Sequence, residues 1–598
     1  MAVVATAGHV DHGKSTLVRA LTGIEPDRWS QERARGLTID LGFAWTTLPS
    51  GREVSFVDVP GHQRFVGNLL AGLGPAPVVC FVVAVDEGWQ AQSADHRDAI
   101  AALGINTGVV VLTRMDRAPQ RVAEVRAQVR TELARTGLAQ APMVPVSAVE
   151  GDGLGDLAHT LDQVLAQMPA PEVTAPVRLW VDRAFAVDGA GTVVTGTLAQ
   201  GSLARGDSLD VFSRGTSTTT AVRGLQTHQE RVERVTPATR VAVNLRGVAK
   251  EAVGRGDVLL SPGAWLVTDS IDVRRRAGAA FPDMPAEFTV HVGTASVPAR
   301  CRPFDADHAR LRLAAPLPLR VGDQAVLRGS GTPVVLGGVV VLDVDPPALV
   351  RRGAGGVRAD VLARMGRGRP AADLLIELDR RAAVTVQALA RLGLPIPDQL
   401  PRGVQRHEEW LVDARALHRW AEHLAEHVSG HLAADALSQG VSDGSAIDLL
   451  GLPDPALLPL VVRSAGLVQR GGRITRAAAP RDLGAAEQGV AELQRRLRAE
   501  PFVAPTADAL AQWGLGAKEL AAAERQHRVL RLDDDIVLLP DAPARAMRVL
   551  ASLEQPFTTS AARQALGTTR RTAVPLLEHL DARGWTRRVD GTQRVVVR

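Results

Sequence analysis

Residues 8–15 read G-H-V-D-H-G-K-S and directly follow the short apolar run Val3-Val4-Ala5. This is the phosphate-loop pattern G-x-x-x-x-G-K-[ST] in the setting that it requires, a β-strand that leads into an α-helix. Backbone N–H groups of such a loop and the positive end of the helix dipole bind nucleotide phosphates. The sequence therefore predicts an N-terminal nucleotide-binding domain, with these phosphate-binding residues: His9, Val10, Asp11, His12, Gly13, Lys14, Ser15 and Thr16.

The scarcity of lysine strengthens this prediction. Besides Lys14 the chain contains only Lys250 and Lys518, and its other cationic residues are arginines and histidines. A lysine would occupy the motif position by chance roughly 3 times in 598, so the alternative of a glycine-rich turn without nucleotide is disfavoured. Lys14 is expected to reach the β- and γ-phosphates.

Two further segments are expected to hold Mg²⁺ and sense the γ-phosphate. Asp58-Val59-Pro60-Gly61-His62 follows an apolar strand, which places Asp58 to hold Mg²⁺ through water and Gly61 to sense the γ-phosphate. The hydroxyl of Ser15 is the Mg²⁺ ligand that a phosphate loop supplies. Thr38 could add its hydroxyl only while GTP is bound, which is the ordering step of a GTPase switch.

A guanine-recognition segment, Thr113-Arg114-Met115-Asp116, ends the expected fourth strand. Asp116 can accept hydrogen bonds from N1–H and the N2 amino group of guanine, contacts that adenine cannot make. Ser147-Ala148 would add a backbone contact to guanine O6. Each of these short motifs is weak evidence alone, but five of them in the expected order along the chain predict GTP binding. The expected guanine-binding residues are Thr113, Arg114, Asp116, Ser147 and Ala148.

Length and composition are typical of a multidomain protein. A chain of 598 residues, 45% of them hydrophobic, is expected to form about four to six domains. It has no run of about 18 apolar residues, so we expect no membrane span, and the phosphate-loop strand starts too early for a signal peptide. Cys80 and Cys301 lack metal-ligand spacing and are expected to be reduced core residues. We therefore expect a cytoplasmic protein.

Charge is concentrated at the C-terminal end. Residues 541–598 contain ten arginines and five acidic residues, a net charge of +5, whereas the whole chain carries +4 and the rest therefore −1. A basic module on a nearly neutral body indicates a polyanionic partner. On charge alone, a solvated arginine-rich face remains the alternative.

The pattern of elements changes twice along the chain. Residues 54–59, 78–85 and 109–112 are typical of buried parallel strands, and helical segments lie between them. From 177 to about 344, short β runs alternate with Gly-Asp turns, as in β-barrels. The remaining residues repeat a helix pair followed by a glycine-turn hairpin, which is the pattern of a winged helix.

The predicted fold class is multidomain, with an α/β P-loop GTPase domain, two β-barrels and a mainly α C-terminal array of winged helices. The expected boundaries are 1–170 for the GTPase domain, 175–264 and 265–346 for the barrels, and 365–420, 421–478, 479–540 and 541–598 for the winged helices.

These motifs resemble those of the translational GTPases, and G-H-V-D-H-G-K with D-V-P-G-H resembles elongation factor Tu in particular. Residues 5–14, 35–43 and 182–197 are more similar to the selenocysteine-specific elongation factors, as is the short loop over 23–36. The resemblance covers the chain end to end, because the four winged helices also match that family's domain order.

The resemblance implies a GTP-dependent elongation factor that delivers selenocysteyl-tRNA to the ribosome at UGA codons, while the C-terminal winged helices bind an mRNA hairpin. It implies GTP/GDP and Mg²⁺ as cofactors, ribosome-stimulated hydrolysis of GTP, and a cytoplasmic monomer without membrane contact. His62 would orient the attacking water, and Val10 with Leu37 would form an apolar gate in front of it. The alternative is that His62 is an ordinary loop histidine.

One position departs from the family pattern. The guanine motif usually has lysine where this chain has Arg114. The aliphatic stem of arginine can still flank the base, so we expect altered nucleotide affinity rather than its loss.

The resemblance also implies a pocket for the aminoacyl group. A selenol is more acidic than a thiol, so selenocysteine is largely an anion at neutral pH, and arginine is the suitable partner. Arg183 and Arg240 match positions that line this pocket in the family, and Asp40 and Phe43 are weaker candidates for its wall. Alternatively, both arginines lie on the barrel surface without a specific role.

RNA contact is expected in the last winged helix. Residues 567–572 begin its recognition helix, and shape and backbone dominate the recognition of RNA duplexes. The expected RNA-binding residues are Arg570 and Arg571 on this helix and Arg587, Arg588 and Arg594 on the wing. The first two winged helices carry more acidic residues, such as Glu408, Glu409 and Asp413, and are expected to act as spacers.

Two alternative functions remain open from the sequence. A general elongation factor for ordinary aminoacyl-tRNAs would not need the long basic C-terminal extension. A non-catalytic RNA tether would not need the switch residues Thr38, Gly61 and His62.

Overall fold

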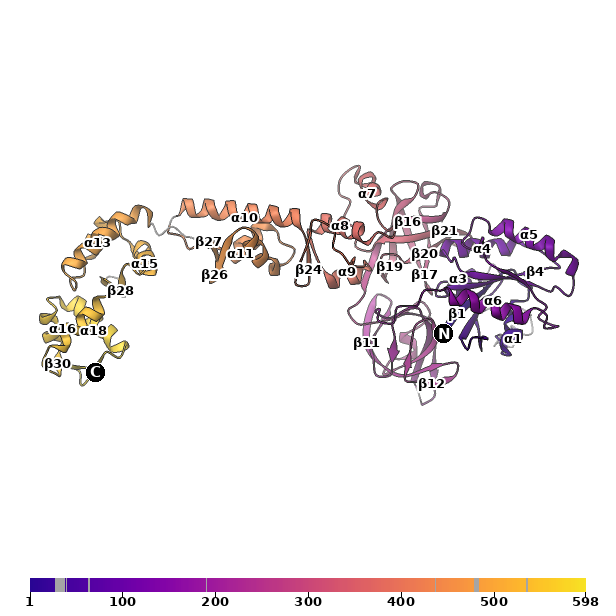
Figure 1. Ribbon diagram of the computed structural model, residues 1–598, viewed down its shortest axis with the longest axis horizontal. Coiled ribbons are helices and arrows are strands. Elements are labelled where there is room, and N and C mark those ends of the chain that lie inside the picture. Colours follow the sequence, from indigo (N-terminus) through magenta and orange to yellow (C-terminus); the bar gives the residue numbers. More distant parts are fainter. Residues whose placement is uncertain are drawn as a thin grey trace. The chain divides into compact units, whose positions relative to one another are not determined.

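The computed structural model describes residues 1–26, 38, 40–62, 65–189, 191–435, 437–477, 483–533 and 536–597. Contacts divide the chain into two compact units. The first comprises Met1–Arg380, Val384–Arg402 and Glu408–Leu411, and the second comprises Arg381–Ala383, Gly403–His407 and Val412–Arg598. The first unit contains the N-terminal α/β domain and both β-barrels (Figure 1).

A six-stranded sheet in the order β2-β3-β1-β4-β5-β6 forms the N-terminal domain. Alternate residues of its valine-rich strands enter two different apolar clusters, so helices cover both faces. Only β2 runs antiparallel to its neighbour. The strands are β1 (Ala2–Ala7), β2 (Gly42–Thr47), β3 (Glu53–Asp58), β4 (Val78–Ala84), β5 (Gly108–Thr113) and β6 (Met143–Pro145); the helices are α1 (Lys14–Thr22), α3 (Val66–Leu73), α4 (Ala91–Leu103), α5 (Val122–Leu133) and α6 (Leu154–Ala166).

The second domain is a seven-stranded antiparallel sheet in the order β10-β15-β7-β8-β14-β11-β12. Strand β11 also pairs with β10, which closes the sheet into a barrel around a core of valine and leucine. The strands are β7 (Arg178–Val187), β8 (Gly191–Leu198), β10 (Ser208–Ser213), β11 (Thr216–Thr227), β12 (Glu230–Val232), β14 (Thr239–Leu245) and β15 (Val258–Leu260), with the small pair β9 (Leu203–Ala204) and β13 (Arg234–Val235) beside them.

The third domain is a closed barrel in the order β16-β19-β18-β17-β20-β21. It is joined to the second domain by Arg178, whose guanidinium binds both carboxylate oxygens of Asp323 at 2.5 and 2.6 Å and lies over the Trp265 ring. Its strands are β16 (Leu266–Gly278), β17 (Glu287–Val292), β18 (Ala295–Pro303), β19 (His308–Leu319), β20 (Gln324–Gly329) and β21 (Val335–Asp343).

The N-terminal domain packs directly on this third domain. Helix α4 contacts β21, and Gly338 lies so close to the backbone of Ala102 that no Cβ would fit there. Val326 of β20 belongs to the same apolar cluster as the α4 side chains. These contacts connect the helix beside the phosphate loop to the third domain.

The second domain reaches the N-terminal domain through the hairpin between β11 and β12. Its two turn residues, His228 and Gln229, have φ values of 50° and 68°. A two-residue turn of this kind favours Asn-Gly, so these residues hold an unfavourable conformation. His228 stacks on Trp45 with ring centroids 5.4 Å apart and forms a 2.9 Å hydrogen bond with Ser55.

An ion network fixes helix α7 (Ala354–Leu362) on the third domain. Arg358 bridges the carboxylates of Asp272 and Asp343 at 2.7 and 2.5 Å, and Arg310 adds a second cation to Asp272. Burial raises the pKa of Asp343, while the neighbouring arginines oppose that shift. Because both carboxylates are buried, the removal of Arg358 would leave their charges less well compensated in the core.

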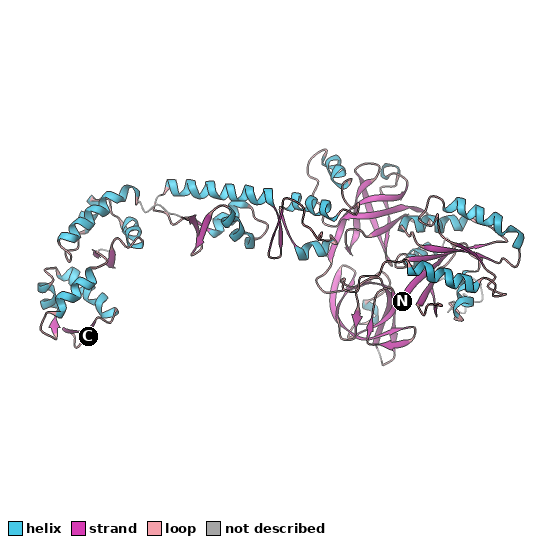
Figure 2. Ribbon diagram, viewed as in Figure 1, coloured by secondary structure: helices cyan, strands magenta, loops and turns pink. Residues whose placement is uncertain are grey.

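The remaining elements are helices with small sheets, as the colours of Figure 2 show. Each small sheet follows or flanks a group of helices, which is the winged-helix arrangement. The elements are α8 (Pro370–Arg381), β22 (Ala383–Thr385), α9 (Val386–Leu392), β23 (Val404–His407) and β24 (Trp410–Asp413); α10 (Ala414–Ala434), β25 (Val441–Ser442), α11 (Asp443–Leu450), α12 (Leu458–Ser464), β26 (Leu467–Arg470) and β27 (Arg473–Arg476); α13 (Glu487–Ala499), α14 (Ala507–Gln512), α15 (Ala517–Arg525), β28 (Leu530–Asp533) and β29 (Ile536–Leu538); and α16 (Ala542–Ala551), β30 (Phe557–Thr558), α17 (Thr559–Ala565), α18 (Arg570–Ala582), β31 (Thr586–Arg588) and β32 (Gln593–Val596).

The last two groups share one apolar core. A single cluster of buried residues runs from Leu483 through α13 and α15 to Leu580 of α18. The third and fourth winged helices therefore pack as one body.

In the described part of the chain, no single helix has the length and apolar composition of a membrane span. The segments Asp443–Leu450 and Pro455–Ser464 meet both criteria only when they are taken as a pair, and the pair is bent by 106° at the break between them.

Candidate functional site

The phosphate loop connects β1 to α1 through backbone conformations that glycine permits. Gly8 and Gly13 have φ values of 131° and 82°, and a Cβ on Gly8 would collide with the backbone of Val82. Asp11 also has a positive φ of 63°, which is unfavourable for a side chain and persists only where the surroundings impose it. The ammonium of Lys14 lies inside the loop and donates to the carbonyls of Gly8 and His9 at 3.1 and 2.8 Å.

Neighbouring elements hold this loop from two sides. On α4, Gln92 accepts a hydrogen bond from the Val10 N–H at 3.1 Å, and His96 Nδ1 accepts one from the Gly8 N–H at 3.0 Å. At the end of β5, Thr113 donates to the His12 carbonyl at 2.7 Å. The loop backbone is therefore fixed before a ligand arrives, which is the preorganisation that anion binding requires.

The side chain of His12 points away from the phosphate cavity into the core. It is fully buried and lies 3.4 Å from the Val82 carbonyl. Burial lowers the pKa of His12 to about 3, so its imidazole is neutral. A phosphate contact from His12 could therefore come only from its backbone N–H.

Three oxygen-bearing side chains converge beside the loop. The Ser15 hydroxyl donates to Asp58 at 2.6 Å and lies 3.1 Å from the hydroxyl of Thr38. Thr6 donates to the other Asp58 oxygen at 2.6 Å. Burial raises the pKa of Asp58, while Lys14 and the two hydroxyl donors oppose that shift. Hard oxygen donors of this kind suit Mg²⁺.

The next segment brings Gly61 against the phosphate loop. A Cβ on Gly61 would lie 2.6 Å from Val10 N and 2.7 Å from Lys14 Nζ, so only glycine fits. His62 follows at once, partly exposed, with its ring centroid 6.2 Å from that of Phe65. Val10 lies in the loop, whereas Leu37, the second expected gate residue, lies outside the described residues.

One cavity of about 530 Å³ joins the phosphate, metal and guanine segments. Its volume is in the range of small-molecule sites. Ser147 is fully buried and outside its lining, whereas its neighbour Ala148 lines the cavity. The lining includes Val10, Asp11, Gly13, Lys14, Ser15, Thr16, Thr38, Gly61, Thr113, Arg114, Asp116 and Ala148.

Arg114 makes more contacts than flanking a base requires. Its guanidinium donates to the Asp11 carbonyl of the phosphate loop and to the carboxylates of Asp86 and Glu87 at 3.2 and 2.7 Å. The guanine segment, the phosphate loop and the loop after β4 are thus tied together by one side chain.

A second cluster forms where the second domain meets the N-terminal domain. Arg183 and Arg240 both lie over the Phe43 ring, at 4.9 and 3.3 Å from its centroid. Arg183 also pairs with Asp40 at 3.0 Å, and Arg240 binds the buried Asp182. The structure therefore brings the four expected aminoacyl-pocket residues together.

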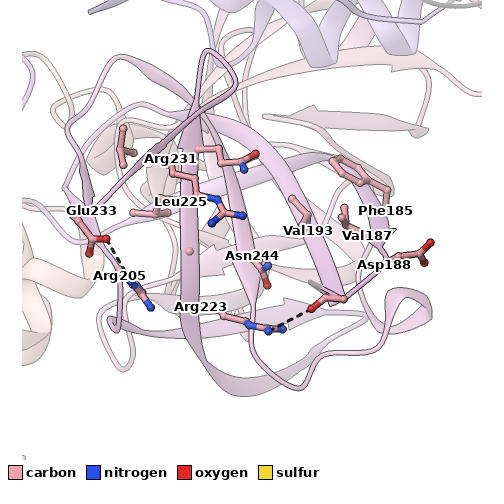
Figure 3. A pocket seen from close by; sticks show the side chains of 15 residues that line it. Phe185, Val187, Asp188, Val193, Arg205, Arg223, Leu225, Arg231, Glu233 and Asn244 are labelled. Carbon is pink, nitrogen blue, oxygen red and sulfur yellow. Dashed lines mark hydrogen bonds and ion pairs between the residues drawn. The ribbon is translucent and has the colours of Figure 1, made fainter.

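Two features of this region were missed from the sequence. Arg255 approaches Asp40 at 3.6 Å and donates to Asn68 at 2.8 Å, with 32% of its side chain exposed. Its turn, Arg255-Gly256-Asp257, reads only as a turn signal in the sequence. The second feature is a cavity of about 520 Å³ lined by residues of β7, β8, β11, β12 and β14 (Figure 3). Figure 3 shows Phe185, Arg223 and Asn244 around it.

The expected RNA-binding arginines divide into two groups. Arg570 and Arg571 are exposed at the start of α18, and Arg587 and Arg588 are exposed on β31. Arg594 is only 2% exposed, because it pairs with Asp581 at 2.8 Å and donates to Thr559 at 3.1 Å inside the domain. Arg594 therefore holds the wing onto the helices rather than facing solvent.

Family models match four parts of the chain. They describe the elongation factor Tu GTP-binding domain over residues 1–167, elongation factor Tu domain 2 over 191–260, the β-barrel domain of the selenocysteine-specific elongation factor over 283–348, and the winged helix of elongation factor SelB over 548–595.

Relatives match much or all of the length of the chain. The selenocysteine-specific elongation factor of Desulfomicrobium baculatum is 30% identical over 635 residues, which cover 99% of each chain. That of Escherichia coli K12 is 37% identical over 59% of this chain and 56% of its own. The crystal structure of a bacterial selenocysteine-specific elongation factor EF-Sec matches 100% of both chains with a TM-score of 0.78 and 26% identity. The chain thus belongs to the selenocysteine-specific elongation factors, a family of translational GTPases that bind guanine nucleotides.

Proposed function

We propose that this chain carries selenocysteyl-tRNA to the ribosome at UGA codons in a GTP-dependent manner, while its C-terminal winged helices bind an mRNA hairpin. The observation that carries the proposal is the cluster of Arg183 and Arg240 around Phe43. Asp40 and Phe43 lie two and five positions after the switch residue Thr38, so the same stretch of chain borders both the nucleotide cavity and this cluster.

The nucleotide cavity fits Mg²⁺ and GTP. Ser15, Thr38 and, through water, Asp58 would hold Mg²⁺, which neutralises charge on the β- and γ-phosphates when it is bound. Lys14 would neutralise the same phosphates from the loop, and Asp116 would bind the guanine edge. His62 would orient the attacking water; it directly follows Gly61, on which a Cβ would lie 2.6 Å from Val10 N of the phosphate loop.

The arginine cluster has an excess of positive charge. Arg183, Arg240 and Arg255 face two carboxylates, those of Asp40 and Asp182, which leaves a net charge of +1 in the cluster. One further anion would balance it. A selenolate meets this requirement at neutral pH, whereas the hydroxyl of serine does not.

The cavity of Figure 3 is a candidate binding site for the aminoacylated end of the tRNA. It lies on β7, β8 and β14, and two of these strands carry Arg183 and Arg240. Phe185 is 41% exposed there and can stack on a base, and the Gln226 and Asn244 amides can read its edge. We infer that the terminal nucleoside of the tRNA binds here, with its aminoacyl group toward the arginine cluster.

The fourth winged helix is the proposed mRNA contact. Arg570 and Arg571 begin α18, where the helix dipole favours phosphates, and Arg587 and Arg588 extend this surface on β31. Arg594 is not part of the proposed surface because it is buried.

The proposal is tested by the affinity of the GTP-analogue form for one selenocysteine tRNA charged with either selenocysteine or serine. We expect a preference for selenocysteine of about 10²-fold, equal to about 2.7 kcal/mol. Arg240→Gln should abolish most of this preference, while Arg223→Gln, at a position that lines the Figure 3 cavity and donates to the Gly189 carbonyl, should leave it unchanged. Equal binding of both charged tRNAs by the wild-type chain would reject the anion pocket and favour a general aminoacyl-tRNA carrier.

Catalysis is tested separately through His62→Ala. We expect this variant to bind GTP normally and to lose ribosome-stimulated hydrolysis by at least about 10²-fold, because positioning dominates phosphoryl transfer. Wild-type hydrolysis that the ribosome does not stimulate would instead support the non-catalytic RNA tether.

A further inference from the structure

The second winged helix separates its charges along the sequence. Residues 421–454 contain six acidic residues and no lysine or arginine. Residues 455–477 contain four arginines and no acidic residue. The four arginines are Arg463, Arg470, Arg473 and Arg476. The acidic character that suggests a spacer is therefore confined to the first part of this domain.

The basic part forms the wing of the domain. Strands β26 and β27 pair around the turn Gly471-Gly472, whose φ values are 55° and 74°. Arg470 and Arg473 flank this turn and lie directly opposite each other in the register. Both side chains are exposed, as are Arg463 at the end of α12 and Arg476 at the end of β27.

This arrangement is unfavourable for the domain by itself. Like charges directly opposite each other on a hairpin repel and destabilise it. Arg473 donates to the Gly440 carbonyl at 3.0 Å, but within residues 412–435, 437–477 and 483–533 no carboxylate forms an ion pair with Arg463, Arg470 or Arg476. A polyanion would relieve the repulsion.

The wing of the fourth winged helix differs in this respect. Its Arg588 lies 3.9 Å from Glu578, and its Arg594 is buried against Asp581. Carboxylates of that domain thus neutralise part of its wing. The wing of the second winged helix is the less compensated of the two.

We propose that the wing of the second winged helix binds the phosphate backbone of double-stranded RNA, as a contact additional to that of the fourth. Two arginines beside a glycine turn are narrow enough to reach into a groove, and guanidinium groups bind phosphate oxygens in pairs. Such binding depends on the shape of the RNA backbone rather than on the base sequence.

The surroundings favour RNA over an acidic protein. Protein interfaces have an apolar core with a polar rim. Among the described residues between 412 and 477, no large hydrophobic side chain is exposed. Electrostatic contacts with RNA phosphates, which weaken as the salt concentration rises, do not need an apolar core.

The test uses the full chain with Arg570→Gln and Arg571→Gln as background, so that the fourth winged helix contributes little. The probe is a blunt 20-base-pair RNA duplex without bulges. Adding Arg470→Gln and Arg476→Gln should weaken binding at least 10-fold and lower the slope of log K against log salt by about 2. Arg473 is not substituted, because its side chain also donates a hydrogen bond to the Gly440 carbonyl within the domain.

The matched control replaces two exposed arginines in the first turns of α10, just before residue 421, Arg415→Gln and Arg419→Gln. It should leave affinity and slope unchanged. Arg470→Lys with Arg476→Lys should keep most of the affinity, which separates loss of charge from loss of fold. The proposal is overturned if the α10 pair weakens binding as much as the wing pair, or if a polyglutamate peptide binds the wing as tightly as the duplex.

Discussion

His291 is a titratable side chain enclosed by a barrel. It lies on β17 with 6% of its surface exposed, and its Nε2 atom has no hydrogen-bond partner among the described residues. Burial, reinforced by Arg328, lowers the pKa of His291 from 6.5 to about 4. The unfolded chain therefore binds a proton between these two pH values and the folded chain does not, so this histidine lowers stability as the pH falls below 6.5.

We expect the wild-type third domain to lose about 2 kcal/mol of unfolding free energy between pH 7 and pH 5 through His291. The variant His291→Leu should not show this part of the loss. Hydrogen exchange of the β17 amides, corrected for the intrinsic pH dependence, measures it. Strand β8 of the second domain serves as the internal control, and an identical pH dependence of β17 in both proteins would contradict the prediction.

Arg114 is the residue at which this chain departs from the usual lysine. Its two terminal nitrogens contact different elements, one the Asp11 carbonyl and the other the Asp86 and Glu87 carboxylates. Lysine has a single ammonium and cannot span both.

Arg114→Lys should therefore speed the dissociation of GDP about 3- to 10-fold, which corresponds to the loss of one partly exposed charged hydrogen bond. Stopped-flow measurement with a fluorescent nucleotide tests this. Arg130→Gln, at an exposed position of α5 outside the lining of the nucleotide cavity, is the control and should leave the rate unchanged. Unaltered dissociation from Arg114→Lys would show that the bridge is dispensable.

At the scale of elements, the β11–β12 hairpin carries two tasks. Its strands line the cavity of Figure 3 through Leu225, Gln226 and Arg231, and its turn places His228 against Trp45 and Ser55 of β2 and β3. The unfavourable turn conformation is maintained by these contacts. The hairpin thus connects the proposed tRNA cavity to the sheet edge beside Phe43.

His228→Ala should raise hydrogen exchange of β2 and of β12 together, because it removes one hydrogen bond and one ring contact worth about 1–2 kcal/mol in sum. Gln229→Gly should act in the opposite direction and stabilise the hairpin by about 0.5–1 kcal/mol, since glycine accepts a positive φ. Faster exchange in β12 alone would mean that the hairpin does not hold the N-terminal domain.

At the scale of the molecule, the shared core of the third and fourth winged helices predicts joint unfolding. Leu493 and Leu577 lie in different winged helices and are both fully buried in one cluster. A Leu→Ala change in such a core costs about 2–5 kcal/mol. Two domains that share a core lose protection as a unit.

Leu577→Ala should therefore lower the exchange protection of α13 in the third winged helix as much as that of α18 in the fourth. Native-state hydrogen exchange under increasing denaturant measures both. Val461→Ala, a buried residue of the second winged helix outside this cluster, should leave α13 and α18 unchanged. Protection that falls in α18 but persists in α13 would show that the two domains unfold independently.

The nucleotide site was predictable from the sequence because its chemistry is local. A phosphate loop needs glycines at fixed offsets between a strand and a helix, and the other motifs follow strands whose ends must meet at one sheet edge. The order of an α/β domain, two barrels and a helical array follows in the same way from periodicity and turn residues.

Other features depended on residues far apart in the chain. Arg594 looks like an exposed wing arginine, but its partner Asp581 lies on α18 and takes it into the core. Arg255 joins the arginine cluster only because its turn packs beside Asp40, 215 positions earlier in the chain by residue number. The opposed positive charges on the wing of the second winged helix follow from the strand register, which places Arg470 opposite Arg473. The sequence by itself determined which backbone segments form the candidate nucleotide site, since those conformations depend on neighbouring residues. Only the tertiary structure decided which arginines form ion pairs within the chain, since an ion pair depends on distance in space.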